Sequence, residues 1–267
     1  MKKFELTSEF ITNILGTKLF RIKALMEFGD VKAGDLGGYI EKEENLDHDG
    51  DAWVYGNAEV YGNAEVYGDA EVYGDARVYG NARVYGNAEV CGDARVYGNA
   101  EVYGNAWVYG DARVYGNAEV YGNAWVCGDA RVYGNAEVYG NAEVCGDAEV
   151  YGDARVYGNA EVYGNAWVCG DAEVYGDARV YGNAEVCGNA DYAYAHGFGS
   201  INRTTTFFRL KDGGVGVRCG CFYGTLQEFR DKVRKTHGET KKAKEYLMLA
   251  DLMELRFKEE NEDGKNN

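Results

Sequence analysis

Proline is absent from all 267 residues of the sequence. A proline inside a sheet removes a hydrogen bond from the ladder, so a chain without proline can form long uninterrupted β-structure. The stretch between residues 51 and 190 also lacks lysine and threonine. Without threonine, this stretch cannot form the flat threonine ladders with which some β-helical proteins bind ice.

Long apolar runs are missing as well. No stretch approaches the roughly 20 apolar residues of a membrane-spanning helix, and no apolar run follows Lys2 and Lys3 as it would in a signal peptide. The seven cysteines form an odd set, which favours a reduced protein over a framework of disulfides. We therefore expect a cytoplasmic chain that does not contact a membrane.

One hexapeptide is repeated from Asp51 to Ala190. It reads Val, Tyr or Cys, Gly, Asn or Asp, Ala, and then Glu, Arg or Trp, and valine recurs at every sixth position from Val54 to Val186, which makes 23 copies. Such a fixed period marks a repeat architecture. In a strand of this pattern alanine and valine face one side and the variable residue and tyrosine the other, while Gly-Asn or Gly-Asp supplies a turn.

The repeat resembles the hexapeptide-repeat proteins of bacteria, which fold as left-handed parallel β-helices. Their motif has an aliphatic residue at the first position and a small one at the fifth, where this chain has Val54 and Ala58, then Val60 and Ala64. The resemblance implies an all-β solenoid: a three-sided prism with three hexapeptides in each coil, and seven to eight coils. At about 4.8 Å per coil, the prism would be roughly 37 Å long.

The regions outside the repeat suggest three parts: an N-terminal cap at 1–50, the β-helix at 51–190 and a C-terminal α+β module at 191–267. In the cap, Leu36 stands three hexapeptides, and so one expected coil, before Val54. We therefore predict that Leu36 continues the valine column. On the same register Ile40, four residues later, takes the small-residue slot.

The C-terminal module should contain a hairpin and two helices. Residues 204–222 alternate around a Gly-Gly turn. A Thr-x-x-Glu capping box starts a helix at Thr225. A second helix is predicted from 240 to 258, with an apolar face that includes Leu252 and Leu255, and a disordered polar tail follows it.

The net charge of −16 comes almost entirely from the repeat, where 10 Asp and 12 Glu outnumber 7 Arg. Such a surface disfavours direct binding to nucleic acid or to an anionic membrane. We expect a protein partner with basic surface, and the regular carboxylates could also mimic nucleic acid. The cationic cluster at 230–244 is predicted to be a solvated helix face or, alternatively, a surface that docks on an acidic prism.

Residues one coil apart should form columns along the prism, and one column is tyrosine throughout. It is either an aromatic platform for a sugar or protein, or a ladder that stabilises the sheet. Two cysteine pairs, Cys127 with Cys145 and Cys169 with Cys187, would also be neighbours, without the histidines that a metal site would favour. The tyrosines of this candidate surface are Tyr67, Tyr85, Tyr103, Tyr121 and Tyr139.

Arginine and tryptophan occupy two other columns. Four stacked arginines would repel one another, so we predict that an aspartate two residues before each arginine neutralises it; an anion-binding stripe is the alternative. Exposed tryptophan is a candidate anchor for a partner. The arginines are Arg77, Arg95, Arg113 and Arg131, the aspartates Asp75, Asp93, Asp111 and Asp129, and the tryptophans Trp53, Trp107 and Trp125.

Catalysis is not expected. Many hexapeptide-repeat proteins are acyltransferases with a histidine base, but the three histidines of this chain, His48, His196 and His237, lie outside the repeat. We expect no cofactor and no metal. The family resemblance also implies a homo-oligomer, a trimer or dimer.

The chain also resembles a group of phage and prophage proteins with such repeats. The resemblance lies in residues 19–25, 31–41, the VYGNA repeats, 206–209 and 219–222. It implies a phage-encoded protein in the bacterial host. That protein would bind a host partner or, alternatively, serve in virion structure or assembly.

Overall fold

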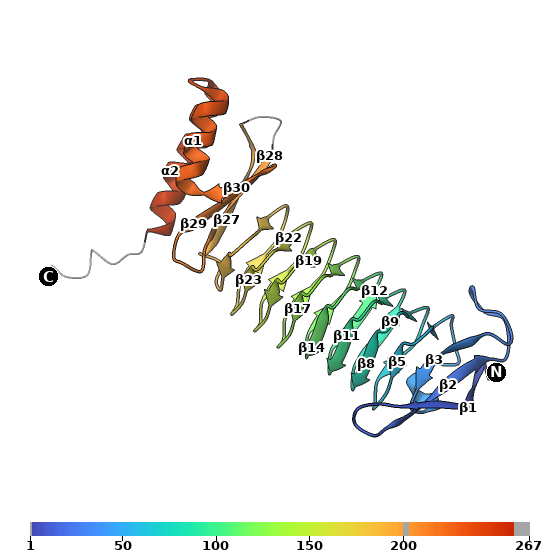
Figure 1. Ribbon diagram of the computed structural model, residues 1–267. Coiled ribbons are helices and arrows are strands. Elements are labelled where there is room, and N and C mark those ends of the chain that lie inside the picture. The colour runs from blue at the N-terminus through green and yellow to red at the C-terminus, as the bar shows by residue number, and fades with distance from the viewer. Residues whose placement is uncertain (1, 200–202, 259–267) are drawn as a thin grey trace.

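The computed structural model describes residues 2–199 and 203–258, so the predicted disordered tail lies outside the described residues. Its centre is a three-sided solenoid, closed at one end by an N-terminal sheet and at the other by a module that carries two helices (Figure 1). The predicted solenoid with three hexapeptides per coil is confirmed, because each repeat strand pairs in parallel with the third strand after it. Val96, for example, lies beside Val114.

Three parallel sheets form the sides of the prism, and we name them by their outward residues. The arginine face contains β5 (Glu59–Val60), β8 (Arg77–Gly80), β11 (Arg95–Gly98), β14 (Arg113–Gly116), β17 (Arg131–Val132), β20 (Glu149–Val150), β23 (Trp167–Val168) and β26 (Glu185–Val186). The tryptophan face contains β4 (Trp53–Val54), β7 (Glu71–Val72), β10 (Glu89–Val90), β13 (Trp107–Val108), β16 (Trp125–Val126), β19 (Glu143–Cys145), β22 (Glu161–Tyr163) and β25 (Arg179–Val180). The tyrosine face contains β6 (Glu65–Val66), β9 (Arg83–Gly86), β12 (Glu101–Gly104), β15 (Glu119–Val120), β18 (Glu137–Val138), β21 (Arg155–Val156) and β24 (Glu173–Val174).

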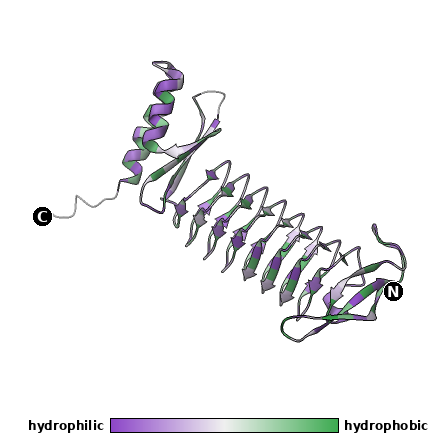
Figure 2. Ribbon diagram, viewed as in Figure 1, coloured by the Kyte–Doolittle hydropathy of each residue, from purple (hydrophilic) through white to green (hydrophobic). Residues whose placement is uncertain are grey.

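The interior of the prism is a column of valine and alanine, and every repeat valine and alanine from Ala52 to Val186 is 0% exposed. Hydropathy therefore alternates along each strand, as the colours of Figure 2 show. Glycine makes each corner possible: Gly116 has a φ of 78°, and a Cβ there would lie 3.0 Å from the backbone of Gly134 in the next coil. Both the left-handed backbone and the close approach require glycine.

The N-terminal cap is an antiparallel sheet of β1 (Phe4–Thr12), β2 (Lys18–Ala24) and β3 (Leu36–Ile40), followed by a short 3-10 helix, η1 (Glu43–Asn45). The prediction that Leu36 continues the valine column was wrong. Ile40 stacks on Val60 instead, and Leu36 is 52% exposed. Leu46 likewise bridges to Val66. The first coil is thus longer than the others, because two additional residues stand between Leu46 and Val54.

The C-terminal module is a four-stranded antiparallel sheet that carries two helices. The strands are β27 (Tyr192–Phe198), β28 (Arg203–Arg209), β29 (Val215–Cys219) and β30 (Phe222–Thr225), and the helices are α1 (Leu226–His237) and α2 (Lys241–Phe257). The capping box of Thr225 and Glu228 is confirmed. The predicted apolar face of α2 was partly wrong, because Leu252 and Leu255 are exposed and Phe257 is buried in their place.

The module docks on the last coils through its strands. Leu210 bridges to Ala184, and the guanidinium of Arg218 lies 4.4 Å from the ring centroid of Tyr181. The alternative prediction, that the cationic cluster at 230–244 docks on the prism of its own chain, was wrong. Arg230 instead pairs with Asp251 and Glu254 within the module.

Two disulfides link adjacent coils, Cys127 with Cys145 and Cys169 with Cys187. The prediction of a fully reduced chain was therefore wrong. In-register stacking brings the Cα atoms of these pairs to 4.6 and 4.3 Å, close enough for two cysteines on adjacent coils to react. This finding removes the support that the cysteine count gave to a cytoplasmic location.

The two disulfides predict how many thiols of the chain can react. The denatured chain should react with Ellman's reagent at three thiols, those of Cys91, Cys219 and Cys221, and at all seven after reduction. The variant Cys127→Ser should release Cys145 and raise the unreduced count to four. Seven reactive thiols in the unreduced wild-type chain would contradict this assignment.

Candidate functional site

The tyrosine column of the tyrosine face is a continuous stack of rings. Neighbouring ring centroids lie 4.7 Å apart for Tyr67 and Tyr85 and 4.9 Å apart for Tyr121 and Tyr139, with interplanar angles of 4° and 2°. The ring planes therefore cover one another along the axis, and the column presents ring edges and hydroxyls to the solvent. A sugar platform needs open ring faces, so this geometry favours the prediction of a stabilising ladder.

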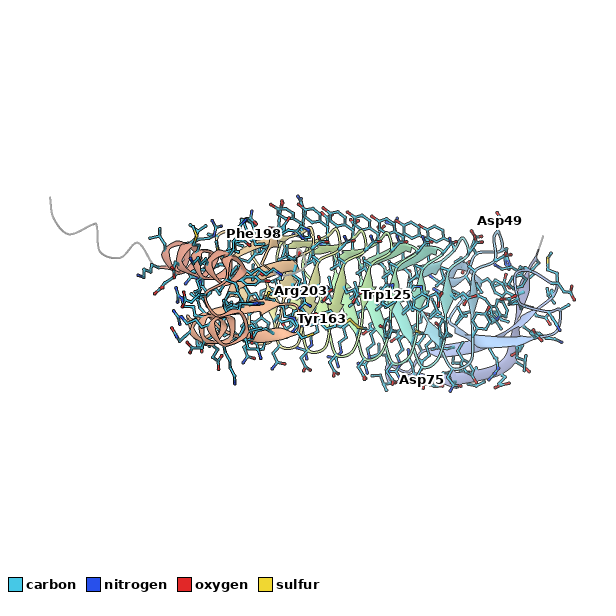
Figure 3. All side chains as sticks on the ribbon, turned by 90° about the horizontal axis from the view of Figure 1, so that it is seen from above. Asp49, Asp75, Trp125, Tyr163, Phe198 and Arg203 are labelled. Carbon is cyan, nitrogen blue, oxygen red and sulfur yellow. A yellow bond between two sulfur atoms is a disulfide. The ribbon has the colours of Figure 1, made fainter. Side chains whose placement is uncertain are left out.

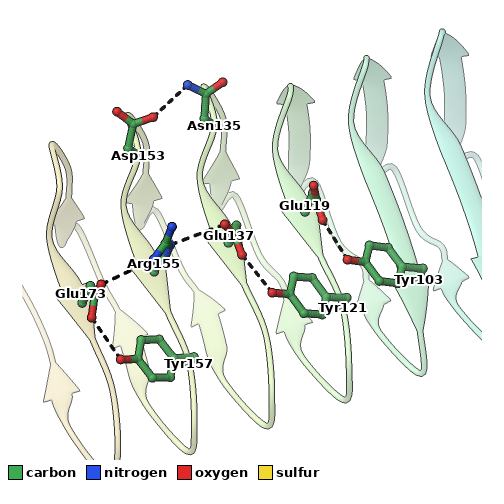
Figure 4. Close-up of polar contacts among 9 residues, drawn as sticks. All are labelled: Tyr103, Glu119, Tyr121, Asn135, Glu137, Asp153, Arg155, Tyr157 and Glu173. Atoms are coloured by element: carbon green, nitrogen blue, oxygen red, sulfur yellow. Dashed lines mark hydrogen bonds and ion pairs between the residues drawn. The ribbon is translucent and has the colours of Figure 1, made fainter.

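A second contact, which the sequence analysis missed, ties the coils together. The hydroxyl of Tyr103 donates to Glu119 at 2.8 Å and that of Tyr121 to Glu137 at 2.9 Å (Figure 4). Each glutamate stands 16 positions after its tyrosine, beside it on the next coil, and that spacing is visible in the sequence. The same figure shows Arg155 between Glu137 and Glu173, at 3.5 and 3.6 Å.

Two corners of the prism carry asparagine ladders, which the sequence analysis also missed. Each side-chain amide donates to the carbonyl oxygen of the next asparagine, as Asn99 does to Asn117 at 3.0 Å. One ladder ends when Asn135 donates to Asp153 at 2.8 Å (Figure 4). Asparagine suits this position because one amide offers both a donor and an acceptor to identical neighbours.

The four stacked arginines lie on one column of the arginine face, in register. The predicted Asp–Arg ladder was wrong. Arg77 pairs along the column with Glu59 at 3.6 Å and Arg131 with Glu149 at 3.1 Å. No ion pair within residues 2–199 and 203–258 joins the two middle arginines, Arg95 and Arg113, to a carboxylate.

Trp107 and Trp125 lie on neighbouring coils of the tryptophan face, near the middle of the rod, where Figure 3 labels Trp125. Their rings stack with centroids 5.7 Å apart, and Tyr109 meets Trp125 edge-on at 6.4 Å. They are 38% and 40% exposed. Together they form an exposed aromatic surface on that face.

The other two tryptophans are covered by the caps of the same chain. Trp53, predicted as an exposed anchor, is only 1% exposed, because Phe4 and Phe28 of the N-terminal cap pack edge-on against its ring at 6.2 and 5.3 Å. Trp167 lies under Lys211 of the C-terminal module, whose ammonium stands 3.5 Å from the ring centroid. Two of the four tryptophans at variable positions therefore pack against an element outside the repeat.

Carboxylates flank the tryptophan pair on its own column. Glu89 precedes Trp107 and Glu143 follows Trp125 in the parallel ladder. Tyr73 donates to Glu89 at 2.7 Å, which fixes the carboxylate beside the indoles. Burial and the nearby Glu89 raise the pKa of the Cys91 thiol on the same face, so this thiol stays protonated at neutral pH.

The histidines do not meet. His48 packs on Phe4 in the N-terminal cap. His196 belongs to β27 and His237 to α1, and both elements lie at the other end of the rod (Figure 1). In the described part of the chain no group of three or more His, Cys, Asp or Glu side chains is placed to hold a metal ion. Neither described helix is long and apolar enough to cross a membrane.

A family model described as YdcK beta solenoid repeat matches five segments of the array, residues 70–86, 76–92, 94–110, 112–128 and 154–170. The family match and the stacked coils both indicate a solenoid of repeats. The chain is a β-solenoid repeat protein. A search of curated proteins gives no match.

The tyrosine ladder of this solenoid makes a testable prediction for alkaline pH. Burial, followed by the hydrogen bond to Glu173, raises the pKa of Tyr157 to about 12, and burial together with Glu137 raises that of Tyr121. Ionisation is thus harder in the folded chain than in the unfolded chain, whose tyrosines titrate near 10. This contribution to stability is complete below about pH 10 and is lost as the pH rises through about 12.

Absorbance of tyrosinate near 295 nm, recorded against pH for the native chain and for the chain in denaturant, measures this difference. We expect most repeat tyrosines to ionise above pH 11 in the native chain, together with a falling thermal midpoint. Identical titration curves for the native and denatured chains would contradict the ladder geometry.

Proposed function

We propose that the protein is a non-enzymatic binding protein whose rigid rod presents the tryptophan face to a protein partner. This proposal rests on one observation: two of the four tryptophans pack against the caps, and the other two do not. The N-terminal cap buries Trp53, and Lys211 of the C-terminal module lies over the half-buried Trp167. No cap element covers Trp107 and Trp125 within the described residues, and a partner would supply the cover.

A protein is the favoured class of partner because of the shape and chemistry of this surface. Large aromatic side chains that stand at the centre of a surface and are ringed by polar groups dominate the binding energy of many protein interfaces. The pair lies on the outer side of a parallel sheet, which suits a broad contact rather than a small ligand. The rod behind it is held by backbone hydrogen bonds at every coil, such as Tyr109 to Val126 at 3.0 Å.

Charge favours a partner with basic surface. The column that holds the pair also contains Glu71, Glu89, Glu143 and Glu161, and the chain carries a net charge of −16. Complementary charge speeds association and selects partners. The same charge opposes a homo-oligomer formed face to face through this surface, because two acidic columns would repel each other.

The resemblance to phage and prophage proteins suggests where the partner would be found. We propose a host protein of the bacterial cytoplasm as the partner. The rod would then act by occupying a basic surface on that protein. A role in virion structure or assembly is the alternative, and it predicts phage components in place of a host protein.

The test compares capture by the wild-type protein and by the variant W107A/W125A, with mass spectrometry of the bound proteins. The wild type should capture a basic partner in a salt-sensitive manner. The double variant should lose at least about 30-fold in affinity for the identified partner, since anchor residues contribute roughly 2 kcal/mol or more.

The variant R95Q/R113Q is the matched control, because it changes two half-buried side chains of the same coils on another face. It should bind like the wild type, and circular dichroism should show all three proteins folded. Loss of binding by R95Q/R113Q with retention by W107A/W125A would move the site to the arginine face. Capture of virion components, or of none but the protein itself, would overturn the host-binding proposal.

A further inference from the structure

A cavity in the C-terminal module lies outside the surface discussed above. It has a volume of about 320 Å³ and opens between the β29–β30 hairpin and helix α1. The floor is apolar: Phe222, Phe229, Val233 and Tyr246 line it, and the last three are at most 4% exposed. Sites for small organic molecules combine such a floor with a few placed polar groups.

The charged groups that line the cavity are all cationic or can become so. They are Arg203, Lys232 and His237, and no carboxylate is among the lining residues. No ion pair joins these three side chains to a carboxylate in the described part of the chain. Other cations of the module are paired, as Arg209 is with Asp191 at 3.2 Å and Arg234 with Asp231 at 3.2 Å.

The tight turn between the two strands places one of these cations. Gly220, between Cys219 and Cys221, has a φ of 57°, and a side chain there would collide with the guanidinium of Arg203. Glycine thus lets Arg203 lie across the turn, at the edge of the cavity. The hydroxyl of Thr205 donates to the sulfur of Cys219 at 3.1 Å, which fixes that thiol, while Cys221 is exposed.

We propose that this cavity binds a small aromatic carboxylate, with the ring on the phenylalanine and tyrosine floor and the carboxylate between Arg203 and Lys232. A guanidinium binds a carboxylate through two parallel hydrogen bonds, and among the described residues neither rim cation is paired with a carboxylate that the ligand would have to displace. The acidic rod repels anions at long range, but salt screens this repulsion beyond about 8 Å. The proposal is independent of the tryptophan face.

The probe is 2-naphthoate, with neutral 2-naphthalenemethanol as its matched analogue, titrated against the full chain by ligand-observed NMR. The carboxylate should bind at least fivefold more tightly than the alcohol. The variants Arg203→Gln and Lys232→Gln should each remove most of that preference. Lys235→Gln changes an exposed lysine of the same helix that does not line the cavity, so it should leave the preference unchanged.

Protection of cysteine thiols from alkylation shows where the probe binds. Bound 2-naphthoate should slow alkylation of Cys219 and Cys221 by iodoacetamide and leave Cys91, on the distant rod, unaffected. Leu252→Gln tests the alternative site, the exposed apolar stripe of α2. Equal affinity for the two probes, unprotected thiols, or loss of binding only in Leu252→Gln would each overturn the proposal.

Discussion

The stacking of each repeat residue on its counterpart one coil later is the constraint on which this structure depends. A parallel ladder without register shifts places like on like, at the spacing of β-strands. Side chains that satisfy identical neighbours then gain at every coil: valine packs on valine, tyrosine rings stack, and asparagine amides donate to one another. A charged residue is not stabilised by an identical neighbour, so a column of charged residues is stable when positive and negative side chains alternate.

The charged columns follow this rule only in part. On the tyrosine face, Arg83 and Arg155 interrupt the glutamates and pair with them, but Glu119 still stacks between Glu101 and Glu137. On the arginine face, four arginines follow one another and, among the described residues, only the outer two reach a carboxylate. Stability explains the stacked rings and amides, whereas it leaves the runs of like charge and the exposed tryptophan pair unexplained.

The periodic part of the fold could be predicted from the sequence, because the valine period defines the repeat and the resemblance to hexapeptide-repeat proteins implies three repeats per coil. Together these fix the register and the composition of each column. The non-periodic parts could not. Ile40, and not Leu36, continues the valine column, since counting back from Val54 cannot locate two additional residues. Trp53 and Trp107 occupy equivalent slots of one column, and only the packing of Phe4 and Phe28 distinguishes the buried ring from the exposed one.

The sequence also could not show which neighbouring side chains form a bond with each other. Cys127 and Cys145 were predicted to be neighbours, but column spacing does not say whether two neighbouring thiols are bonded. The 16-residue offset between tyrosines such as Tyr103 and the glutamate of the next coil was visible in the sequence, yet the hydrogen bond depends on the orientation of the two side chains. The cavity at Cys219 and Cys221 requires the packing of α1 on the hairpin, which no local pattern shows.

The in-register stack can be tested most directly with engineered cysteines. In the variant Y97C/Y115C the two thiols would replace stacked rings whose centroids lie 4.9 Å apart, and we expect a new disulfide between them on mild oxidation. In Y97C/Y103C the thiols would lie on different faces, with tyrosines as the column neighbours of position 103, and should stay reduced. Peptide mapping that finds the bond in Y97C/Y103C and not in Y97C/Y115C would contradict a coil of three hexapeptides and, with it, every column described above.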